Sequence, residues 1–281
     1  MSILVFGKTG QLARELARQS GVVCLGRDAA DLGASAAAIR ARIRAAAPEA
    51  VINAAAYTNV DRAEEEEPLA TRINGEAPGV MARECAGMGI PFISVSSDYV
   101  FDGTGVGPWR PGDIPVPLGA YGRSKLLGEQ AVLAAGGTVL RTSWVVSAHG
   151  NNFVRTMVRL GRARDSLAIV ADQVGGPTCA RDLAAACLQM AGALVRAPEK
   201  AGVYHYAGAP DISWAGFARE IFAQAGIICE VRDIPSCEYP TPAQRPLNSR
   251  LYCAETESVF GLGRPDWRGG LADILQELGG G

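Results

Sequence analysis

The sequence lacks the features that mark several classes of protein. Its formal net charge is −2 over 281 residues, which argues against nucleic acid or a membrane surface as the main partner. No apolar run is long enough to span a bilayer, and there are no internal repeats or low-complexity linkers. Seven cysteines are scattered and none forms a C-x-x-C pair, so neither a disulfide framework nor a metal site is predicted.

The composition that remains is typical of a folded protein with a sizeable core. Hydrophobic residues make up 48% of the chain and charged residues 20%. The segment MSILVFG reads directly as a strand, without a charged region followed by a cleavable apolar stretch. Together with the scattered cysteines, this predicts a cytoplasmic protein.

The first half alternates short apolar runs with longer Ala-rich amphipathic stretches. ILVFG precedes QLARELARQ, and GVVCLG precedes SAAAIRARIRAAA. Continuous apolar runs suit strands that are buried on both faces, and helix-length connections suit right-handed crossovers. The sequence therefore predicts an α/β fold with a Rossmann-type, doubly wound parallel sheet.

The pattern changes near residue 150. Two stretches rich in Gly and Pro, DQVGGPTCARDLA and PSCEYPTPAQRPLNSRL, alternate with helix-like segments. We predict that residues 1–150 form an NAD(P)-binding domain, completed by a return of the chain near 168–190. Residues 151–281 are predicted to form mainly a smaller substrate-binding lobe. The acidic run Glu64–Glu67 is interpreted as a solvated helix face.

A phosphate-binding turn is predicted at the first strand. LVFGKTGQLARE reads as a strand, then Gly7-x-x-Gly10-x-x-Ala13, then a helix. Gly7 permits a sharp turn, Gly10 lets the backbone approach a pyrophosphate, and the helix start offers free N–H groups. A tight turn without a ligand is the alternative. The predicted cofactor contacts in this turn are Gly7, Thr9, Gly10, Gln11 and Leu12.

The end of the second strand bears on which dinucleotide is used. Arg27 in VVCLGRDAADL offers a guanidinium to the 2′-phosphate of NADPH, whereas Asp28 beside it suits the ribose hydroxyls of NADH. We expect NADPH, with NADH as the alternative. Asp31 and Leu32 are predicted to lie at the adenine.

A tyrosine and a lysine four residues apart suggest an acid for carbonyl reduction. In YGRSK, Tyr121 and Lys125 fall on one face of a predicted helix. A nearby ammonium should lower the pKa of the phenol from its ordinary value near 10, and the lysine should also hold the nicotinamide ribose. Ser97, with Ser96 as the alternative, supplies a strand-end hydroxyl. The order of these motifs predicts a short-chain dehydrogenase/reductase site.

Further segments resemble one family along nearly the whole chain. VINAAAYTNVDRAEEE, SSDYVFDGTG, YGRSKLLGEQ, DQVGGPTCARDLA and YPTPAQRPLNSRL are similar to those of the dTDP-4-dehydrorhamnose reductases. The last two lie outside the cofactor core, so they separate this family from other reductases of the fold. The resemblance implies NADPH-dependent reduction of dTDP-4-dehydro-L-rhamnose (dTDP-6-deoxy-L-lyxo-4-hexulose) to dTDP-L-rhamnose, the last step of dTDP-rhamnose biosynthesis.

The resemblance also assigns roles to individual residues. It implies that Ser97, Tyr121 and Lys125 are catalytic. It places a strand-end segment along the cofactor: Asn53, Ala54 and Ala55. It implies a set of substrate contacts: Tyr99, Trp144, Asn152, Arg245 and Asn248. Core packing is the alternative for Trp144, and a solvated structural role is the alternative for Arg245.

A bound metal is not predicted. Some members of the family dimerise around Mg²⁺ held by glutamates, and Glu15 matches one such position. Arg181 stands where a second glutamate is expected, so we interpret Glu15 as a helix surface residue. The chain is expected to be a monomer or a homodimer.

Two other functions remain as alternatives. The first is a nucleotide-sugar epimerase or dehydratase on the same scaffold, although Asp98-Tyr99 after Ser97 does not supply the usual Asp-Glu pair. The second is a non-catalytic regulatory subunit similar to the β-subunit of methionine adenosyltransferase. An intact set of Ser97, Tyr121 and Lys125 argues against a protein that only binds.

Overall fold

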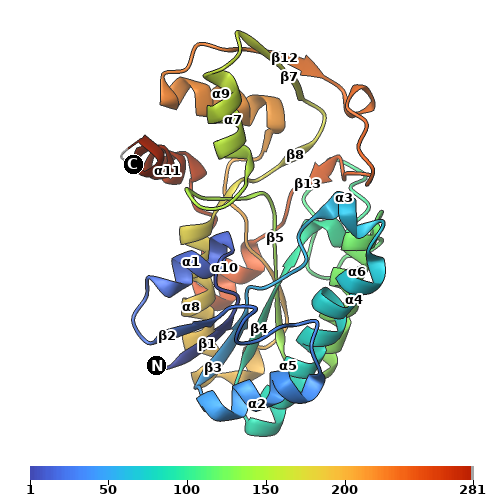
Figure 1. Cartoon of the computed structure of the whole chain (residues 1–281), viewed down its shortest axis with the longest axis vertical. Helices are drawn as coiled ribbons and strands as arrows, with labels where there is room; N and C mark the ends of the chain where they lie inside the picture. Colours follow the sequence, from blue (N-terminus) through green and yellow to red (C-terminus); the bar gives the residue numbers. More distant parts are fainter. Residues whose placement is uncertain (280–281) are drawn as a thin grey trace.

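Six parallel strands form the central sheet in the computed structural model, which describes residues 1–279 (Figure 1). Their order is β2-β1-β3-β4-β5-β10. The order reverses between β1 and β3, the point at which ligand sites form in open α/β sheets. The strands span Ile3–Phe6 (β1), Val22–Leu25 (β2), Ala50–Asn53 (β3), Phe92–Ser97 (β4), Thr138–Thr142 (β5) and Val203–His205 (β10).

Helices cover both faces of this sheet. Ile3 and Val5 of β1 pack into the core on one face, and Leu4 and Phe6 into the core on the other. Because both faces are buried, the strand is apolar throughout. On the first face lie α1 (Gln11–Ala17) and α8 (Ala180–Arg196), with α10 (Ala254–Phe260) beside them. On the second lie α2 (Ala36–Ala46), α5 (Ala77–Met88) and α6 (Ala120–Ala134). The predicted doubly wound α/β fold is confirmed.

A smaller lobe lies beyond the carboxyl ends of the strands (Figure 1). Its core contains Met157, Phe217 and Trp267 from three different helices. Its helices are α7 (Phe153–Gly161), α9 (Trp214–Ala225) and α11 (Trp267–Gly279). Its strands are β6 (Val145–Val146), β7 (Ser166–Val170), β8 (Val174–Gly175), β9 (Thr178–Cys179), β11 (Ile212–Ser213), β12 (Glu230–Ile234) and β13 (Asn248–Ser249).

The chain returns to the central sheet at α8, which begins within the predicted range and packs on β3 and β4. The prediction placed the return near 168–190. In the structure, β7 pairs with β12 in the smaller lobe, α8 packs against α1, and the returning strand is β10, beside β5. The amphipathic pattern of α8 was visible in the sequence, but the three residues of β10 were too few to identify.

The acidic run Glu64–Glu67 is largely solvated, as predicted, since Glu64 and Glu65 are exposed and Glu66 and Glu67 are half-buried, but it also makes contacts that were not predicted. The run lies where α3 (Val60–Ala63) leads into α4 (Glu67–Thr71) and the π-helix Arg72–Glu76. Three of its carboxylates accept hydrogen bonds from other elements: Glu64 from the Ala120 amide, Glu66 from the Tyr57 hydroxyl, and Glu67 from the Arg123 guanidinium. These partners lie between nine and 56 residues away in sequence, out of reach of a local pattern.

A buried ion pair joins α6 to the sheet. Arg141 on β5 donates to Glu129 on α6 through Nε at 2.9 Å and Nη2 at 2.7 Å, and both side chains are 3% exposed. The second terminal nitrogen lies 3.3 Å from His205 Nε2 and donates to the Pro111 carbonyl at 3.2 Å. Burial, followed by Arg141, lowers the pKa of His205 to about 3. The neutral imidazole can therefore accept from Arg141.

Among residues 1–279, no helix has the length and apolarity needed to cross a membrane.

We predict that Glu129→Gln lowers the free energy of unfolding by about 3–5 kcal/mol, because it leaves the Arg141 guanidinium buried without its carboxylate. Urea denaturation measures this change. Asp233→Asn, which breaks the exposed Arg219–Asp233 pair, is the control and should cost less than about 1 kcal/mol. Equal, small losses in both variants would show that the buried pair has no special role.

Candidate active site

The turn after β1 leaves room for a ligand. Gly7 has φ +121°, and a Cβ there would come within 3.2 Å of the backbone of Ala54 and Ala55. At Gly10, by contrast, a Cβ would meet no atom of residues 1–279 within 4 Å. The backbone at Gly10 is therefore open on the side where a pyrophosphate would approach, and the start of α1 offers N–H groups there. These residues fit the dinucleotide that the turn predicted.

The side chains of Gln11 and Asn152 are hydrogen-bonded to each other between the phosphate-binding turn and the smaller lobe. The Gln11 Oε1 accepts from Ser147 Oγ at 2.8 Å and from Asn152 Nδ2 at 3.0 Å, while its Nε2 donates to the Val145 carbonyl at 3.0 Å. Asn152 Oδ1 also accepts from the Arg155 amide and so caps α7. The structure thus places Asn152 against the phosphate-binding turn, joining the two lobes, rather than beside Arg245.

The predicted adenine end lies beside a cavity. Leu32 is buried, and the cavity next to it has a volume of about 330 Å³. Loop residues 32–36 line one side, and Arg72, Glu76 and Val80 line the other. Asp31 uses Oδ1 to accept from the Gly33 amide at 2.9 Å, which shapes this loop. Arg27 is exposed.

Buried polar groups without partners gather at the carboxyl edge of the sheet. Asn53 at the end of β3, Ser96 near the end of β4 and Thr142 at the end of β5 are each at least 95% buried. Asn53 Nδ2, Ser96 Oγ and Thr142 Oγ1 have no hydrogen-bond partner in the described part of the chain. Buried polar atoms are almost always satisfied, so such a row at one edge indicates groups that await a ligand.

Tyr121 lies against the end of β4, where the sequence predicted the acid. Its ring packs edge-to-face on Tyr99 at a centroid distance of 5.5 Å, and the nearby Ser97 acts against burial, which raises the pKa of Tyr121. The Ser97 hydroxyl donates to Asp98 Oδ1 at 3.0 Å and accepts from the Tyr99 amide at 3.2 Å. A hydroxyl and a phenol thus stand together at the sheet edge.

The expected effect of Lys125 on the acidity of Tyr121 is wrong for this structure. Burial, followed by the charge of Asp98, raises the pKa of Tyr121 to about 12. The Lys125 ammonium donates instead to the Val95 carbonyl on β4 at 2.7 Å. Burial lowers the pKa of Lys125 to about 8, while Glu129 acts in the opposite direction. Desolvation is therefore the largest influence on the pKa of both side chains.

Asp98 is a buried residue of this site that the sequence did not predict. Its side chain is 2% exposed, and burial raises its pKa to about 6, while hydrogen bonds with Ser249 and Ser97 lower it. Ser249 lies on β13, so this carboxyl lies close to the smaller lobe. Only its place next to Ser97 pointed to it in the sequence, because Ser249 is distant along the chain.

Arg245 reaches the same edge from the smaller lobe. Burial raises the pKa of the Tyr99 phenol, and the positive charge of Arg245 lowers it by a smaller amount. Its Nη2 donates to Asp61 Oδ2 at 2.7 Å, and its Nη1 is buried without a partner in the described residues. One edge of the guanidinium is therefore available to an anion.

The remaining two predicted substrate residues, Trp144 and Asn248, have contacts of their own in the structure. Trp144, which has φ +49°, stacks on Trp214 of α9 at a centroid distance of 3.5 Å. Asn248 donates to the carbonyls of Thr104 and Gly107 and accepts from Arg250, which uses its whole amide. Asn248 therefore holds the loop that follows β4, and its predicted contact with substrate is not supported by this geometry.

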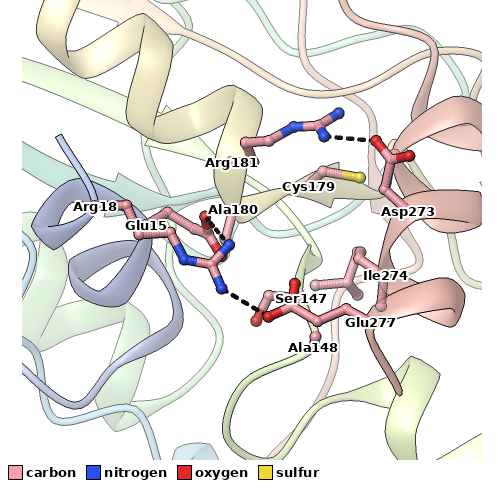
Figure 2. Close-up of a pocket in the computed structure, with 12 residues that line it drawn as sticks. Glu15, Arg18, Ser147, Ala148, Cys179, Ala180, Arg181, Asp273, Ile274 and Glu277 are labelled. Carbon is pink, nitrogen blue, oxygen red and sulfur yellow. Dashed lines mark hydrogen bonds and ion pairs between the residues drawn. The ribbon is translucent and has the colours of Figure 1, made fainter. Parts of the chain in front are cut away.

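The acidic cluster around Glu15 does not fit a metal ion. A cavity of about 60 Å³ between α1, α8 and α11 is too small for a sugar nucleotide (Figure 2). Glu15 was predicted to lie on the helix surface, but it is buried. It pairs with Arg18 at 3.3 Å and with His149 at 3.0 Å. Arg18 also pairs with Glu277 at 2.6 Å. A guanidinium thus neutralises both carboxylates that a cation would need.

We predict that divalent cations change neither the stability nor the oligomeric state of the protein through the cluster around Glu15. Dialysis against EDTA, or addition of Mg²⁺, should shift the melting temperature by less than about 1 °C, because binding to the folded state alone would raise it. Differential scanning fluorimetry measures the shift, and size-exclusion chromatography with light scattering follows assembly. A fall in melting temperature or a change of oligomer with EDTA would contradict the interpretation.

The chain matches the family described as "RmlD substrate binding domain" over residues 1–279. It is 42% identical to a dTDP-4-dehydrorhamnose reductase of Sinorhizobium fredii over 279 residues, which is 95% of this chain and 94% of the relative. It is 43% identical to one of Burkholderia thailandensis, with 99% of both chains covered.

Solved structures agree with these relatives. A dTDP-4-dehydrorhamnose reductase of Clostridium acetobutylicum superposes with a TM-score of 0.92 at 35% identity, covering 99% of this chain and 100% of that one. The same enzyme from Bacillus anthracis, crystallised in complex with NADP, gives 0.90 at 31% identity with the same coverage.

Proposed function

The chain belongs to the RmlD family of dTDP-4-dehydrorhamnose reductases, and from this premise we propose that it reduces dTDP-4-dehydro-L-rhamnose to dTDP-L-rhamnose with NADPH. One observation in the fold carries the proposal. The Tyr121 phenol lies against Ser97 at the carboxyl end of β4, and Lys125 follows one turn later on the same helix. This is an acid, a hydroxyl and a cation at the edge where the cofactor binds in folds of this kind.

The residues of the site divide the work of ketone reduction. NADPH supplies the hydride to C4 of the sugar when it is bound. Tyr121, which keeps its proton because of its raised pKa, donates that proton to the carbonyl oxygen as negative charge develops there. Ser97 hydrogen-bonds the same oxygen and orients it. Lys125 holds the ribose hydroxyls through its ammonium, and the partnerless Asn53 amide donates to the cofactor.

The cofactor and the substrate occupy opposite sides of Tyr121 in this proposal. Gly10 and the start of α1 would hold the pyrophosphate, and the cavity beside Leu32 would take the adenine. The free edge of Arg245 receives the diphosphate of the dTDP-sugar, because a guanidinium binds phosphate oxygens through paired hydrogen bonds. We propose that the protein is cytoplasmic and acts as a monomer or a homodimer, with residues 1–150 binding the cofactor.

The direct test follows NADPH absorbance with dTDP-6-deoxy-L-lyxo-4-hexulose as the substrate. We expect turnover by the wild-type chain and a fall in kcat of about two to four orders of magnitude in Tyr121→Phe, because the proton donor is lost. NADPH affinity, measured by fluorescence quenching, should change little. Near wild-type turnover in Tyr121→Phe would exclude the phenol as the acid. A product other than dTDP-rhamnose would instead favour an epimerase or a dehydratase.

The choice between NADPH and NADH has its own test. Arg27→Ala should lower kcat/KM with NADPH and leave kcat/KM with NADH nearly unchanged, since the guanidinium would pair with the 2′-phosphate alone. A loss of about tenfold corresponds to one charge-assisted hydrogen bond. Steady-state kinetics with both cofactors give the ratio. An unaltered ratio removes Arg27 from the cofactor site.

A further inference from the structure

A short helix after β3 touches both the catalytic helix and the substrate side of the site. Asp61 of α3 contacts the loop before β13, and Glu64, just after α3, contacts the first turn of α6. We propose that these two carboxylates are positioning residues, Asp61 for the Arg245 guanidinium and Glu64 for the turn that carries Tyr121. The inference rests on the proposed function and adds to it two residues that touch neither reactant.

Asp61 fixes its loop through both carboxylate oxygens. Oδ2 accepts from Arg245 Nη2 at 2.7 Å, and Oδ1 accepts from the Ala243 amide at 3.2 Å. The side chain thus holds the backbone and the guanidinium of the same loop. Arg245 Nη1 is buried and has no partner within residues 1–279, so the ion pair leaves this nitrogen free to donate to another acceptor. A planar guanidinium held by one edge presents the other to a phosphate oxygen in a fixed direction.

Glu64 completes the start of α6. Oε1 accepts from the Ala120 amide at 2.9 Å, and Ala120 directly precedes Tyr121. The residue at the N-cap, Gly119, has no side chain that could accept this bond, and a Cβ there would collide with Glu64 Oε1. The glycine therefore admits a carboxylate from another element as the cap. A negative charge at a helix N-terminus is also stabilised by the helix dipole.

The two contacts act on different halves of the reaction. Arg245 is placed to bind the diphosphate of the substrate. If the guanidinium is no longer held by Asp61, substrate binding should weaken. Tyr121 delivers the proton, so displacement of its turn slows the chemical step, and even small misplacement of a reacting group is costly. Asp61 and Glu64 lie one helical turn apart, yet their removal should alter different kinetic constants.

The neighbouring Glu65 provides a matched control. It lies in the same acidic run and is exposed, and its carboxylate makes no ion pair or side-chain hydrogen bond in the part of the chain that the structure describes. Glu65→Gln removes the same charge from the same segment, so it reports the effect of charge alone.

The experiment compares Asp61→Asn, Glu64→Ala, Glu64→Gln and Glu65→Gln in the full chain. Rates are expressed per NADPH-binding site, counted by fluorescence titration, so that partial unfolding does not count as slow chemistry. We expect Asp61→Asn to raise KM for the dTDP-sugar about tenfold with kcat within about twofold, and to weaken binding of dTDP alone, measured by calorimetry. Glu64→Ala should lower kcat about tenfold or more with KM nearly unchanged.

The Glu64→Gln and Glu65→Gln variants separate the role of the hydrogen bond to Ala120 from that of charge alone. Glu64→Gln keeps an oxygen that can accept from Ala120, so it should restore most of kcat, whereas Glu65→Gln should resemble the wild type. The inference is overturned if Asp61→Asn and Glu64→Ala change the same constant, or if both remain within twofold of the wild type. Failure of the wild-type chain to oxidise NADPH with the keto-sugar would count against the proposed function, while dTDP binding by Asp61→Asn would still test the position of Arg245.

Discussion

Desolvation of a phenol, a carboxyl and an ammonium at the end of β4 is the constraint on which this site depends. Tyr121, Asp98 and Lys125 are packed between the sheet, α6 and the smaller lobe, and in each case burial is the largest influence on the pKa. Each group is thereby pushed toward its neutral form. The phenol therefore stays protonated at neutral pH and gives up its proton only to a stronger base than its own phenolate, such as the oxyanion that develops during ketone reduction.

The desolvation of these groups depends on contacts between the two lobes of the chain. Asp98 on the sheet side lies near Ser249 of β13, and Arg245 of the smaller lobe donates to Asp61 of the sheet side. Gln11 and Asn152 join the lobes again at the phosphate-binding turn. Residues from both lobes thus bury the reacting groups. The atoms of Asn53, Ser96 and Thr142 that lack hydrogen-bond partners lie at the same edge of the sheet.

Local sequence patterns predicted the sheet and the position of the acid. The apolar run of β1 indicated burial on both faces, and the spacing of Tyr121 and Lys125 placed both on one side of α6. The patterns could not predict protonation, because the burial of Tyr121 depends on partners far along the chain. For the same reason they misjudged Glu15, whose partner His149 belongs to another element, and they did not predict the hydrogen bonds of the run Glu64–Glu67. A carboxylate looks solvated in sequence until its distant partner is known.

The central claim is that burial, assisted by Asp98, sets the acidity of Tyr121, and a spectroscopic titration tests it most directly. The difference in near-ultraviolet phenolate absorbance between the wild-type chain and Tyr121→Phe isolates this one side chain. The account predicts that the Tyr121 phenolate forms well above the ordinary value near 10, toward a pKa of about 12, and at lower pH in Asp98→Asn. A phenolate that forms near or below pH 10 in the ligand-free protein, unaffected by Asp98→Asn, would contradict it.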